Sequence, residues 1–364
     1  MANILRRWDW WLIAGVSLIA ILSLSSLYSL SYNDTKPLSI FWRQLIWFAL
    51  GFIVLFLFSL LDYRLFFNYR WVTMFVYFLA IALLIIVAVA GPIIRGVKGW
   101  LILGPFQFQP VEIAKLALIL LLAKFFSFRH IEIALSRHLL ISFFYCFVLA
   151  ALIAIQPDLG SSILIFGIWF GIVLCSGLSR KQFLTTVLIF AILTGLLWQS
   201  FLKDYQKERI VSFFYPNRDP LGINYSVIQA KIAIGSAGFF GKGVAQGTQS
   251  QLGFLPESKT DFIFASFVEE RGFLGGIFLI GLFTFFILRC LKIGRAAPDN
   301  FARFFILGSM IMLGLQFLMN VGSNLGLIPV TGINLPFLSY GGSNLLINFA
   351  VLGIIQSIAI RTKM

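Results

Sequence analysis

Long runs of apolar residues recur along the chain, with short polar stretches between most of them. A bilayer core takes about 20 apolar residues from one helix, and these runs lack the apolar-polar alternation of transmembrane strands. The pattern therefore predicts an all-α, polytopic membrane protein with about ten transmembrane helices. The runs cover roughly residues 10–30, 41–61, 71–90, 111–126, 139–156, 160–177, 183–201, 264–289, 303–322 and 341–360.

One large polar interruption separates the seventh run from the eighth, at about residues 202–261. It gathers glycines, glutamines, lysines and carboxylates in a chain that is otherwise nearly all apolar. Within it, Ile228 and Ile232 have helical spacing, so residues 225–234 are expected to form a short interfacial helix. We expect one membrane-embedded domain over residues 1–364, with this segment as its large loop.

Composition and charge agree with this architecture. Of the 364 residues, 60% are hydrophobic and 12% are charged, which leaves no room for a large soluble domain. The net charge of +14 comes from Lys and Arg that are concentrated in alternate short loops and at both ends of the chain. By the positive-inside rule, both termini are cytoplasmic and the large loop lies outside. No basic run or base-stacking motif indicates a nucleic-acid partner.

Polar residues gather where the even-numbered runs begin, which is the outer face in this topology. Free N–H groups and a partial positive charge at helix N-termini favour anions. Four such termini at one surface predict an anion site suited to a pyrophosphate head group. The polar strings are Gln109-Pro-Val-Glu112-Ile-Ala-Lys115, Gln156-Pro-Asp158-Leu-Gly, Thr260-Asp261 and Ser339-Tyr-Gly-Gly-Ser343-Asn344.

Asp261 lies where the loop ends and the eighth run begins, and the sequence leaves two interpretations open. An aspartate at this place is a good helix N-cap. A carboxylate between a dry interior and water also suits a general base. The nearby charges of Lys242, Glu257 and Lys259 favour the second interpretation.

Glu112 and Lys115 are three residues apart on a predicted helix, so they share a face. They form either a structural ion pair or a ligand-facing pair, and the cost of charge at membrane depth favours the ligand. Asp158 stands at a predicted helix start and is again either a cap or a site residue. Pairing within the bundle is expected for three charged residues further into the eighth run, which are Glu269, Glu270 and Arg271.

The glycines of the loop do not form a nucleotide-binding motif. A P-loop would need Ser or Thr where the chain has Gly243, and a dinucleotide fingerprint would need Gly or Ala where it has Gln246. We interpret these glycines as positions where the backbone folds tightly or approaches a ligand closely. They are Gly235, Gly238, Gly241, Gly243 and Gly247.

Several further strings follow in order: Gln229-Ala-Lys231-Ile-Ala-Ile-Gly, Leu255-Pro-Glu257, Thr260-Asp261-Phe-Ile-Phe and Leu338-Ser-Tyr-Gly-Gly-Ser343. Together with the strings before the fourth and sixth runs, they closely resemble the SEDS family (shape, elongation, division and sporulation). The resemblance is greatest to the rod-elongation branch of the family. It covers nearly the whole chain, and the combined set is highly specific although each string alone is weak.

The resemblance implies a multi-pass enzyme of the bacterial inner membrane, surrounded by membrane lipids. Such an enzyme polymerises lipid II, an undecaprenyl-pyrophosphate-linked disaccharide peptide, into glycan strands for cell elongation and rod shape. Its implied partner is a class B penicillin-binding protein that cross-links the strands. The family's essential aspartate corresponds to Asp261. Its other sensitive positions, which we expect to bind substrate, correspond to Glu112, Lys115, Asp158 and Ser343, with Lys242 and Glu257 as weaker matches.

Lipid II already carries a leaving group, so inverting transfer needs one base and charge neutralisation. We predict that Asp261 takes the proton of the acceptor hydroxyl. Lys115, Lys242 and the helix N-termini would stabilise the charge on the pyrophosphate. A divalent cation, Mg²⁺ or Mn²⁺, would suit the carboxylates, and the sequence leaves a metal site undecided.

Two alternatives stay open. A lipid II flippase or transporter would also have many helices and buried charges, but transporters place their decisive polar groups near the bilayer midplane. In this chain the polar groups crowd one face. The second alternative is the division-type member of the same family.

Overall fold

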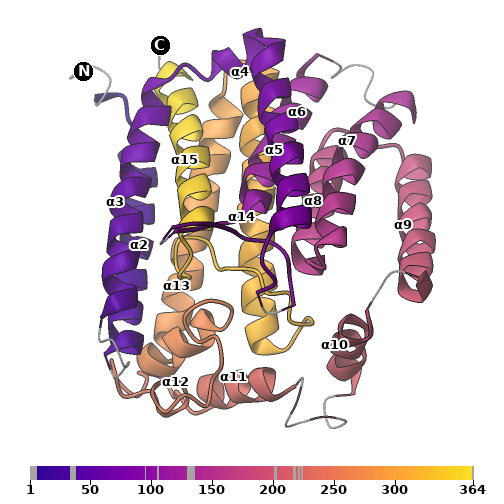
Figure 1. Ribbon diagram of the computed structural model, residues 1–364. Coiled ribbons are helices and arrows are strands. Elements are labelled where there is room, and N and C mark those ends of the chain that lie inside the picture. The colour runs from indigo at the N-terminus through magenta and orange to yellow at the C-terminus, as the bar shows by residue number, and fades with distance from the viewer. Residues whose placement is uncertain are drawn as a thin grey trace.

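The computed structural model describes residues 6–32, 38–94, 96–104, 106–128, 136–200, 203–215, 219, 222 and 224–362. Each apolar run contains a helix, and the helices form a bundle (Figure 1). The predicted all-α membrane fold is confirmed. The helices that match the runs are α2 (Trp10–Ser31), α3 (Ser39–Leu60), α5 (Arg70–Ala90), α6 (Pro110–Ser127), α7 (Ser136–Ile155), α8 (Leu159–Cys175), α9 (Arg180–Ser200), α13 (Ile263–Ala296), α14 (Asn300–Leu325) and α15 (Gly342–Thr362).

Seven helices of the described chain are long and apolar enough to cross a membrane by length and composition, namely α2, α3, α5, α7, α13, α14 and α15. α8 is shorter, with 17 residues. α6 carries three charged residues, Glu112, Lys115 and Lys124, within its 18. The count of ten crossings therefore stays a prediction.

The large loop folds into short helices at the end of the bundle opposite both termini (Figure 1). They are α10 (Asp204–Phe214), α11 (Tyr225–Gly235) and α12 (Thr248–Gln251), and α11 confirms the helix predicted over residues 225–234. The apolar pattern does not predict α10 or α12, nor the short α4 (Arg64–Asn68). It also misses an antiparallel hairpin of β1 (Leu101–Leu103) and β2 (Phe106–Phe108), which leads into α6.

α14 is the central helix of the bundle. It packs against α6, α8, α11, α13 and α15, and its aromatic residues Phe301 and Phe305 are fully buried. Helices in lipid associate by close packing and polar contacts, because lipid tails are as apolar as the side chains. Contact with α14 therefore sets the relative positions of the helix starts that carry the predicted site.

α13 is broken at Gly272, where φ is 72° and ψ is −175°. The eighth run, expected as one span over residues 264–289, lies within α13, and the break divides off residues 263–271 as a separate helical segment. The break leaves backbone groups on both sides without helical partners. The loop pairs with them: Phe273 N donates to Gly238 O at 2.9 Å, and Gly243 N donates to Glu270 O at 3.0 Å.

Close backbone approach explains why glycines stand at this junction. A Cβ at Gly272 would overlap the backbone of Phe239 and Gly241, and a Cβ at Gly241 would overlap the carbonyl of Glu270. The interpretation of loop glycines as sites of close approach is confirmed for Gly241. The group that it approaches is another part of the same chain.

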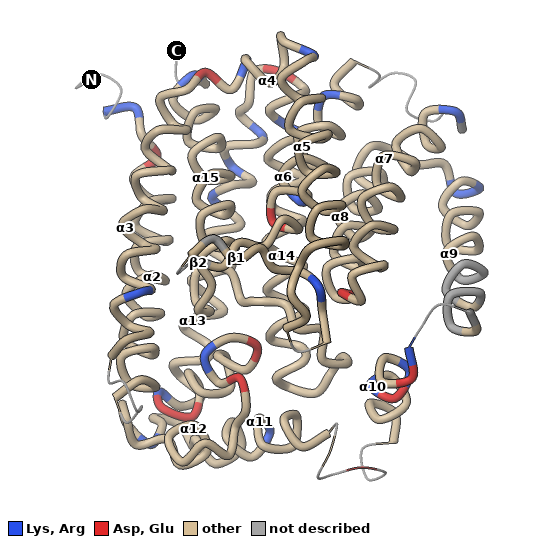
Figure 2. Tube along the Cα trace, in the orientation of Figure 1, with Lys and Arg blue, Asp and Glu red and all other residues tan. Residues whose placement is uncertain are grey.

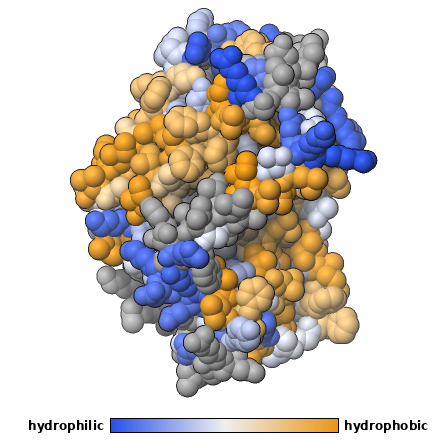
Figure 3. Space-filling model, turned by 90° about the vertical axis from the view of Figure 1, so that its right-hand side faces the viewer, coloured by the Kyte–Doolittle hydropathy of each residue, from blue (hydrophilic) through white to orange (hydrophobic). Residues whose placement is uncertain are grey.

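The surface divides into zones along the bundle axis. Lys and Arg are frequent at the end that holds both termini, and both signs of charge occur around α10, α11 and α12 at the other end (Figure 2). A face of the molecule seen from the side has a broad hydrophobic band between more hydrophilic patches (Figure 3). This distribution is that of a protein whose middle faces lipid.

Candidate functional site

The connection between α14 and α15, residues 326–341, is here called the strap. It contacts two of the helix starts that carry predicted site residues. At α8, a Cβ on Gly160 would overlap the carbonyl oxygen of Thr331. At α13, Gly332 lies against the carboxylate of Asp261. The strap then leads directly into α15, so three of the predicted helix starts meet around one segment.

Asp261 is half-buried and lies one residue before Phe262, which is the N-cap of α13. The interpretation of Asp261 as the cap residue is therefore not supported. Its Oδ2 atom is 3.8 Å from the position that a Cβ on Gly332 would occupy. The Oδ2 atom of the carboxylate thus lies beside the strap.

Glu112 and Lys115 lie in the first two turns of α6 and form a buried ion pair, with Nζ 2.6 Å from Oε2. The shared face predicted from their spacing is confirmed. Asn344 of α15 donates to the same Glu112 oxygen at 3.0 Å, and Asn348 donates to the Asn344 Oδ1 atom at 2.9 Å. Two amides thus link the start of α15 to the ion pair of α6.

Ser343 joins the same two helices through backbone groups. Its Oγ atom donates to Gln107 O at 3.1 Å and accepts from Gln109 N at 3.1 Å. These bonds hold the end of the β1–β2 hairpin against the start of α15. The structure therefore brings Ser343 together with Glu112 and Lys115, whose helix begins at the residue after Gln109.

Asp158 is the N-cap of α8. Its carboxylate accepts from Ser161 N at 3.0 Å and from Ser161 Oγ at 2.7 Å, so the cap interpretation is confirmed. The side chain is half-buried, and it stands two residues from the strap contact at Gly160. A contact of Asp158 with substrate stays a prediction.

Glu257 shapes the turn that leads to Asp261. It has a positive φ of 51°, its carbonyl accepts from Thr260 N and Phe262 N at 3.1 Å each, and its carboxylate accepts from Thr260 Oγ1 at 3.1 Å. Its substrate contact is likewise a prediction.

Lys242 is placed in a different cluster, at the far end of the 263–271 segment. Its Nζ atom lies 3.0 Å from the Oε1 atom of Glu269, whose side chain is completely buried. The same carboxylate accepts from Gln249 N and Ser250 N at the start of α12, at 2.8 and 3.1 Å. Glu269 thus attaches the glycine-rich loop to α13.

Glu270 and Arg271 complete this second cluster. Arg271 donates to Ser25 and Ser26 of α2 at 2.6 and 2.9 Å and pairs with Glu270 at 3.4 Å. Ser29 of α2 donates to Glu270 as well. The expectation that these charges are paired inside the protein is confirmed.

Asn320 and Asn324 were not identified in the sequence, although both contact the carbonyl of Asp261. Their Nδ2 atoms donate to it at 3.0 and 2.8 Å, and the two side chains are 1% and 0% exposed. Amides one turn apart inside an apolar helix are costly unless they are hydrogen-bonded. Two asparagines four residues apart in an apolar run are the sequence signal that could have identified them.

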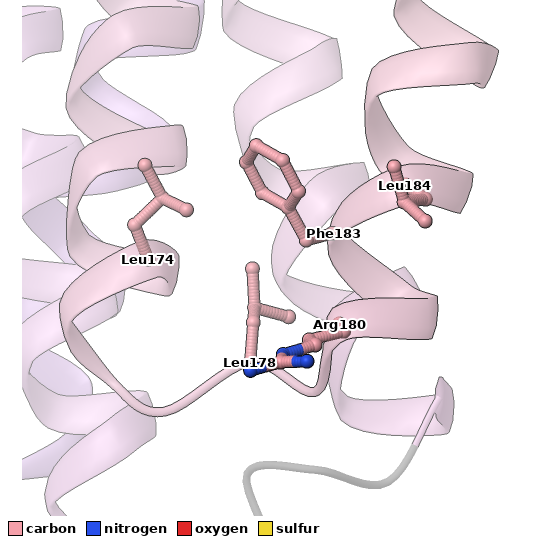
Figure 4. Close-up of a pocket in the computed structure, with 5 residues that line it drawn as sticks. All are labelled: Leu174, Leu178, Arg180, Phe183 and Leu184. Atoms are coloured by element: carbon pink, nitrogen blue, oxygen red, sulfur yellow. The ribbon is translucent and has the colours of Figure 1, made fainter.

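Among the described residues, no group of three or more His, Cys, Asp and Glu side chains is arranged as a metal site would require. A hollow of about 370 Å³ lies elsewhere, between the end of α8 and the start of α9. Leu174, Leu178, Phe183 and Leu184 give it mainly apolar walls beside Arg180 (Figure 4). None of the predicted site residues lines this hollow.

The fold and the site define a polytopic helical membrane protein whose predicted site residues lie at the starts of α6, α8 and α15 and just before α13. Residues 5–364 match the family model described as cell cycle protein, which covers FtsW, RodA and SpoVE. The chain therefore belongs to this family, the SEDS proteins.

Known relatives match over nearly their whole length. The chain is 38% identical over 349 residues to the peptidoglycan glycosyltransferase MrdB of Escherichia coli K12, covering 95% of this chain and 92% of the relative. It is 34% identical over 349 residues to stage V sporulation protein E of Bacillus subtilis, covering 96% and 94%.

Solved structures agree with the fold. One similar chain has a TM-score of 0.83 at 33% identity, with 98% of both chains covered. Its structure comes from work on the structural coordination of polymerization and crosslinking by a peptidoglycan synthase complex. The rod shape determining protein RodA of Thermus thermophilus has a TM-score of 0.69 at 29% identity, covering 97% of this chain and 96% of that chain.

Proposed function

We propose that this protein is a peptidoglycan glycosyltransferase that polymerises lipid II, with Asp261 as the general base. The observation that carries the proposal is the placement of Asp261, whose backbone is held by two buried amides while its carboxylate faces the strap between helix starts. The name of the relative MrdB, a peptidoglycan glycosyltransferase, supports the reaction class.

In the proposed reaction, the acceptor sugar hydroxyl attacks the anomeric carbon of the donor sugar. Asp261 takes the hydroxyl proton as the new C–O bond forms, and the bond to the lipid pyrophosphate breaks with inversion. A positioned base contributes about 10²–10⁴-fold to such a step. The pyrophosphate leaves with the bonding electron pair, so its growing negative charge has to be stabilised.

Charge stabilisation is assigned to Lys115 and to the N-termini of α6, α8 and α15. Lys115 is buried beside Glu112, so its ammonium acts in a site from which water is largely excluded. For Lys242, the predicted contact with the pyrophosphate requires its ammonium to exchange Glu269 for the substrate. A Mg²⁺ or Mn²⁺ ion would be held by one carboxylate together with substrate phosphates.

We further propose that the protein works in rod elongation, with both termini in the cytoplasm and the loop helices outside. The placement of both termini at one end, where Lys and Arg are frequent, supports this orientation (Figure 2). A class B penicillin-binding protein is the proposed partner, and the similarity to a chain of a peptidoglycan synthase complex supports it.

The test compares Asp261→Asn with Asp299→Asn in polymerisation of purified lipid II by the protein with its partner. Asp299 is a matched control, because it is a half-buried N-cap aspartate at the other end of the bundle. We expect Asp261→Asn to lose about 10³-fold or more in kcat and Asp299→Asn to retain parental kcat. Parental glycan strands from folded Asp261→Asn protein would contradict the base assignment. Flipping of lipid II in vesicles without polymerisation would favour the transporter alternative.

A further inference from the structure

Three consecutive carbonyl groups before α13 are bound by donors from outside that helix. Lys259 O accepts from Tyr340 N at 2.9 Å. Thr260 O accepts from Ser339 Oγ at 2.8 Å. Asp261 O accepts from the two amides of α14 described above. The chain entering α13 is thus fixed residue by residue by the strap and by α14.

Asn324 replaces one particular backbone hydrogen bond. In a continuing helix, Ala265 N would donate to Asp261 O, four residues earlier. Here Ala265 N donates to the Oδ1 atom of Asn324 at 3.0 Å, and the Nδ2 atom of Asn324 donates to Asp261 O at 2.8 Å. The carboxamide is inserted between the two backbone groups and satisfies both. The first helical bond is then Ser266 N to Phe262 O, so Asp261 is kept outside the helix.

Asn320 ties the same carbonyl to the strap. Its Nδ2 atom has two hydrogens, one for Asp261 O at 3.0 Å and one for Ile333 O at 2.8 Å. Ile333 follows Gly332, the residue that the Asp261 carboxylate faces. One amide therefore sets the distance between the backbone of Asp261 and the strap opposite its carboxylate.

The chemistry requires asparagine at these two positions. An Asp at 324 would still accept from Ala265 N, but it would place an oxygen against Asp261 O. A Leu at 324 would leave Ala265 N without its acceptor and Asp261 O with the bond from Asn320 alone. Within α14, the second hydrogen of the Asn324 amide is bound by Asn320 O at 2.8 Å, which fixes the orientation of the side chain.

We propose that Asn320 and Asn324 are positioning residues that hold Asp261 in its reactive place by interrupting the start of α13. The proposal rests on the proposed function of Asp261 as the base. A displacement of about 1 Å at a reacting group costs about 10²-fold in rate. Loss of either amide should therefore lower kcat while substrate binding by the other groups persists.

The test measures kcat and KM for lipid II polymerisation by Asn324→Asp and Asn320→Leu, each purified with the partner. We expect kcat to fall by about 10²-fold with KM within about twofold of the parent. Gln316→Leu is the matched control, since Gln316 lies one turn earlier on α14, is fully buried and has no hydrogen-bond partner among the described residues. This variant should keep the parental kcat.

A double variant separates positioning from general support of the fold. If Asn324 acts through Asp261, adding Asn324→Asp to Asp261→Asn causes no further loss of the residual rate. An equal additional loss in that background would overturn the proposal, as would parental kcat in folded Asn324→Asp and Asn320→Leu proteins. If Asn324→Asp does not fold, Asn320→Leu is measured in its place, alone and combined with Asp261→Asn. Parental activity of Asp261→Asn alone would instead contradict the proposed function.

Discussion

Two carboxylates, Asp261 just before the 263–271 segment and Glu269 near its end, have different hydrogen-bond surroundings. The carboxylate of Glu269 is surrounded by donors, which include the ammonium of Lys242 and two backbone N–H groups. Near Asp261, two buried amides of α14 donate to the backbone carbonyl. The carboxylate itself faces Gly332 of the strap.

In the proposed function, this difference distinguishes a structural carboxylate, Glu269, from the proposed base, Asp261. A buried anion that is saturated with donors holds two parts of a protein together and has little capacity left for a reaction. A carboxylate whose backbone is fixed while its oxygens face a neighbouring segment is suited to proton transfer. The donors that surround Glu269 assign it to holding the loop, and the fixed backbone of Asp261 beside the strap supports its proposed role as the base.

Glu269→Ala should produce the largest loss of stability in this comparison. It leaves the ammonium of Lys242 and the first N–H groups of α12 without their acceptor. Breaking a buried pair in this way costs about 3–5 kcal/mol. The midpoint of thermal unfolding in detergent should fall, and proteases should cut within residues 236–257 more rapidly. Asp261→Asn leaves the donors around Glu269 in place and should change both measurements less, and an equal loss of stability in the two variants would remove the distinction.

Gly272→Ala tests whether the break in α13 holds the loop in place. Alanine at φ 72° is strained, and its Cβ would overlap the loop backbone. We expect a cost of about 2–3 kcal/mol, measured as a lower unfolding midpoint. Gly281→Ala is the control on the same helix, because a Cβ there meets no atom within 4 Å. It should be neutral or stabilising by up to about 1 kcal/mol, and similar effects at both positions would contradict the role of the break.

Ser339→Ala and Ser250→Ala form a matched pair with smaller effects. Ser339 donates to Thr260 O at 2.8 Å, next to Asp261, and Ser250 donates to Glu269 at 2.9 Å. Each change should cost about 1 kcal/mol of stability. Only Ser339→Ala should also lower the kcat of polymerisation several-fold, because it loosens the chain beside the proposed base. Equal kcat values for the two variants would show that the strap does not position Asp261.

Much of the fold follows from local properties of the chain. The positions of the main helices come from apolar runs whose length matches the bilayer, and α11 comes from the spacing of Ile228 and Ile232. The pair of Glu112 and Lys115 comes from helical geometry, since residues three apart share a face. Each of these inferences uses neighbours within one or two turns.

Other features depend on residues far apart in the chain. The sequence shows Lys242 and Glu269 as separate charges, and the pairing of a loop residue with a buried helix residue requires the docked loop. Asn324 was invisible as a partner of Asp261, because its contact spans 63 positions. The break at Gly272 also depends on the loop, which supplies partners for the backbone groups that the break exposes.

The sequence by itself determined a polytopic helical protein, the helix starts that carry polar residues and the choice of Asp261 as the candidate base. The helices follow because membrane burial and helix periodicity act on neighbouring residues, and the choice of Asp261 follows from its charged neighbours and from the resemblance to the SEDS family. Only the tertiary structure decided which carboxylate is saturated and which faces the strap. That decision depends on hydrogen-bond donors from α12, α14 and the strap, whose positions are fixed only when the helices pack together.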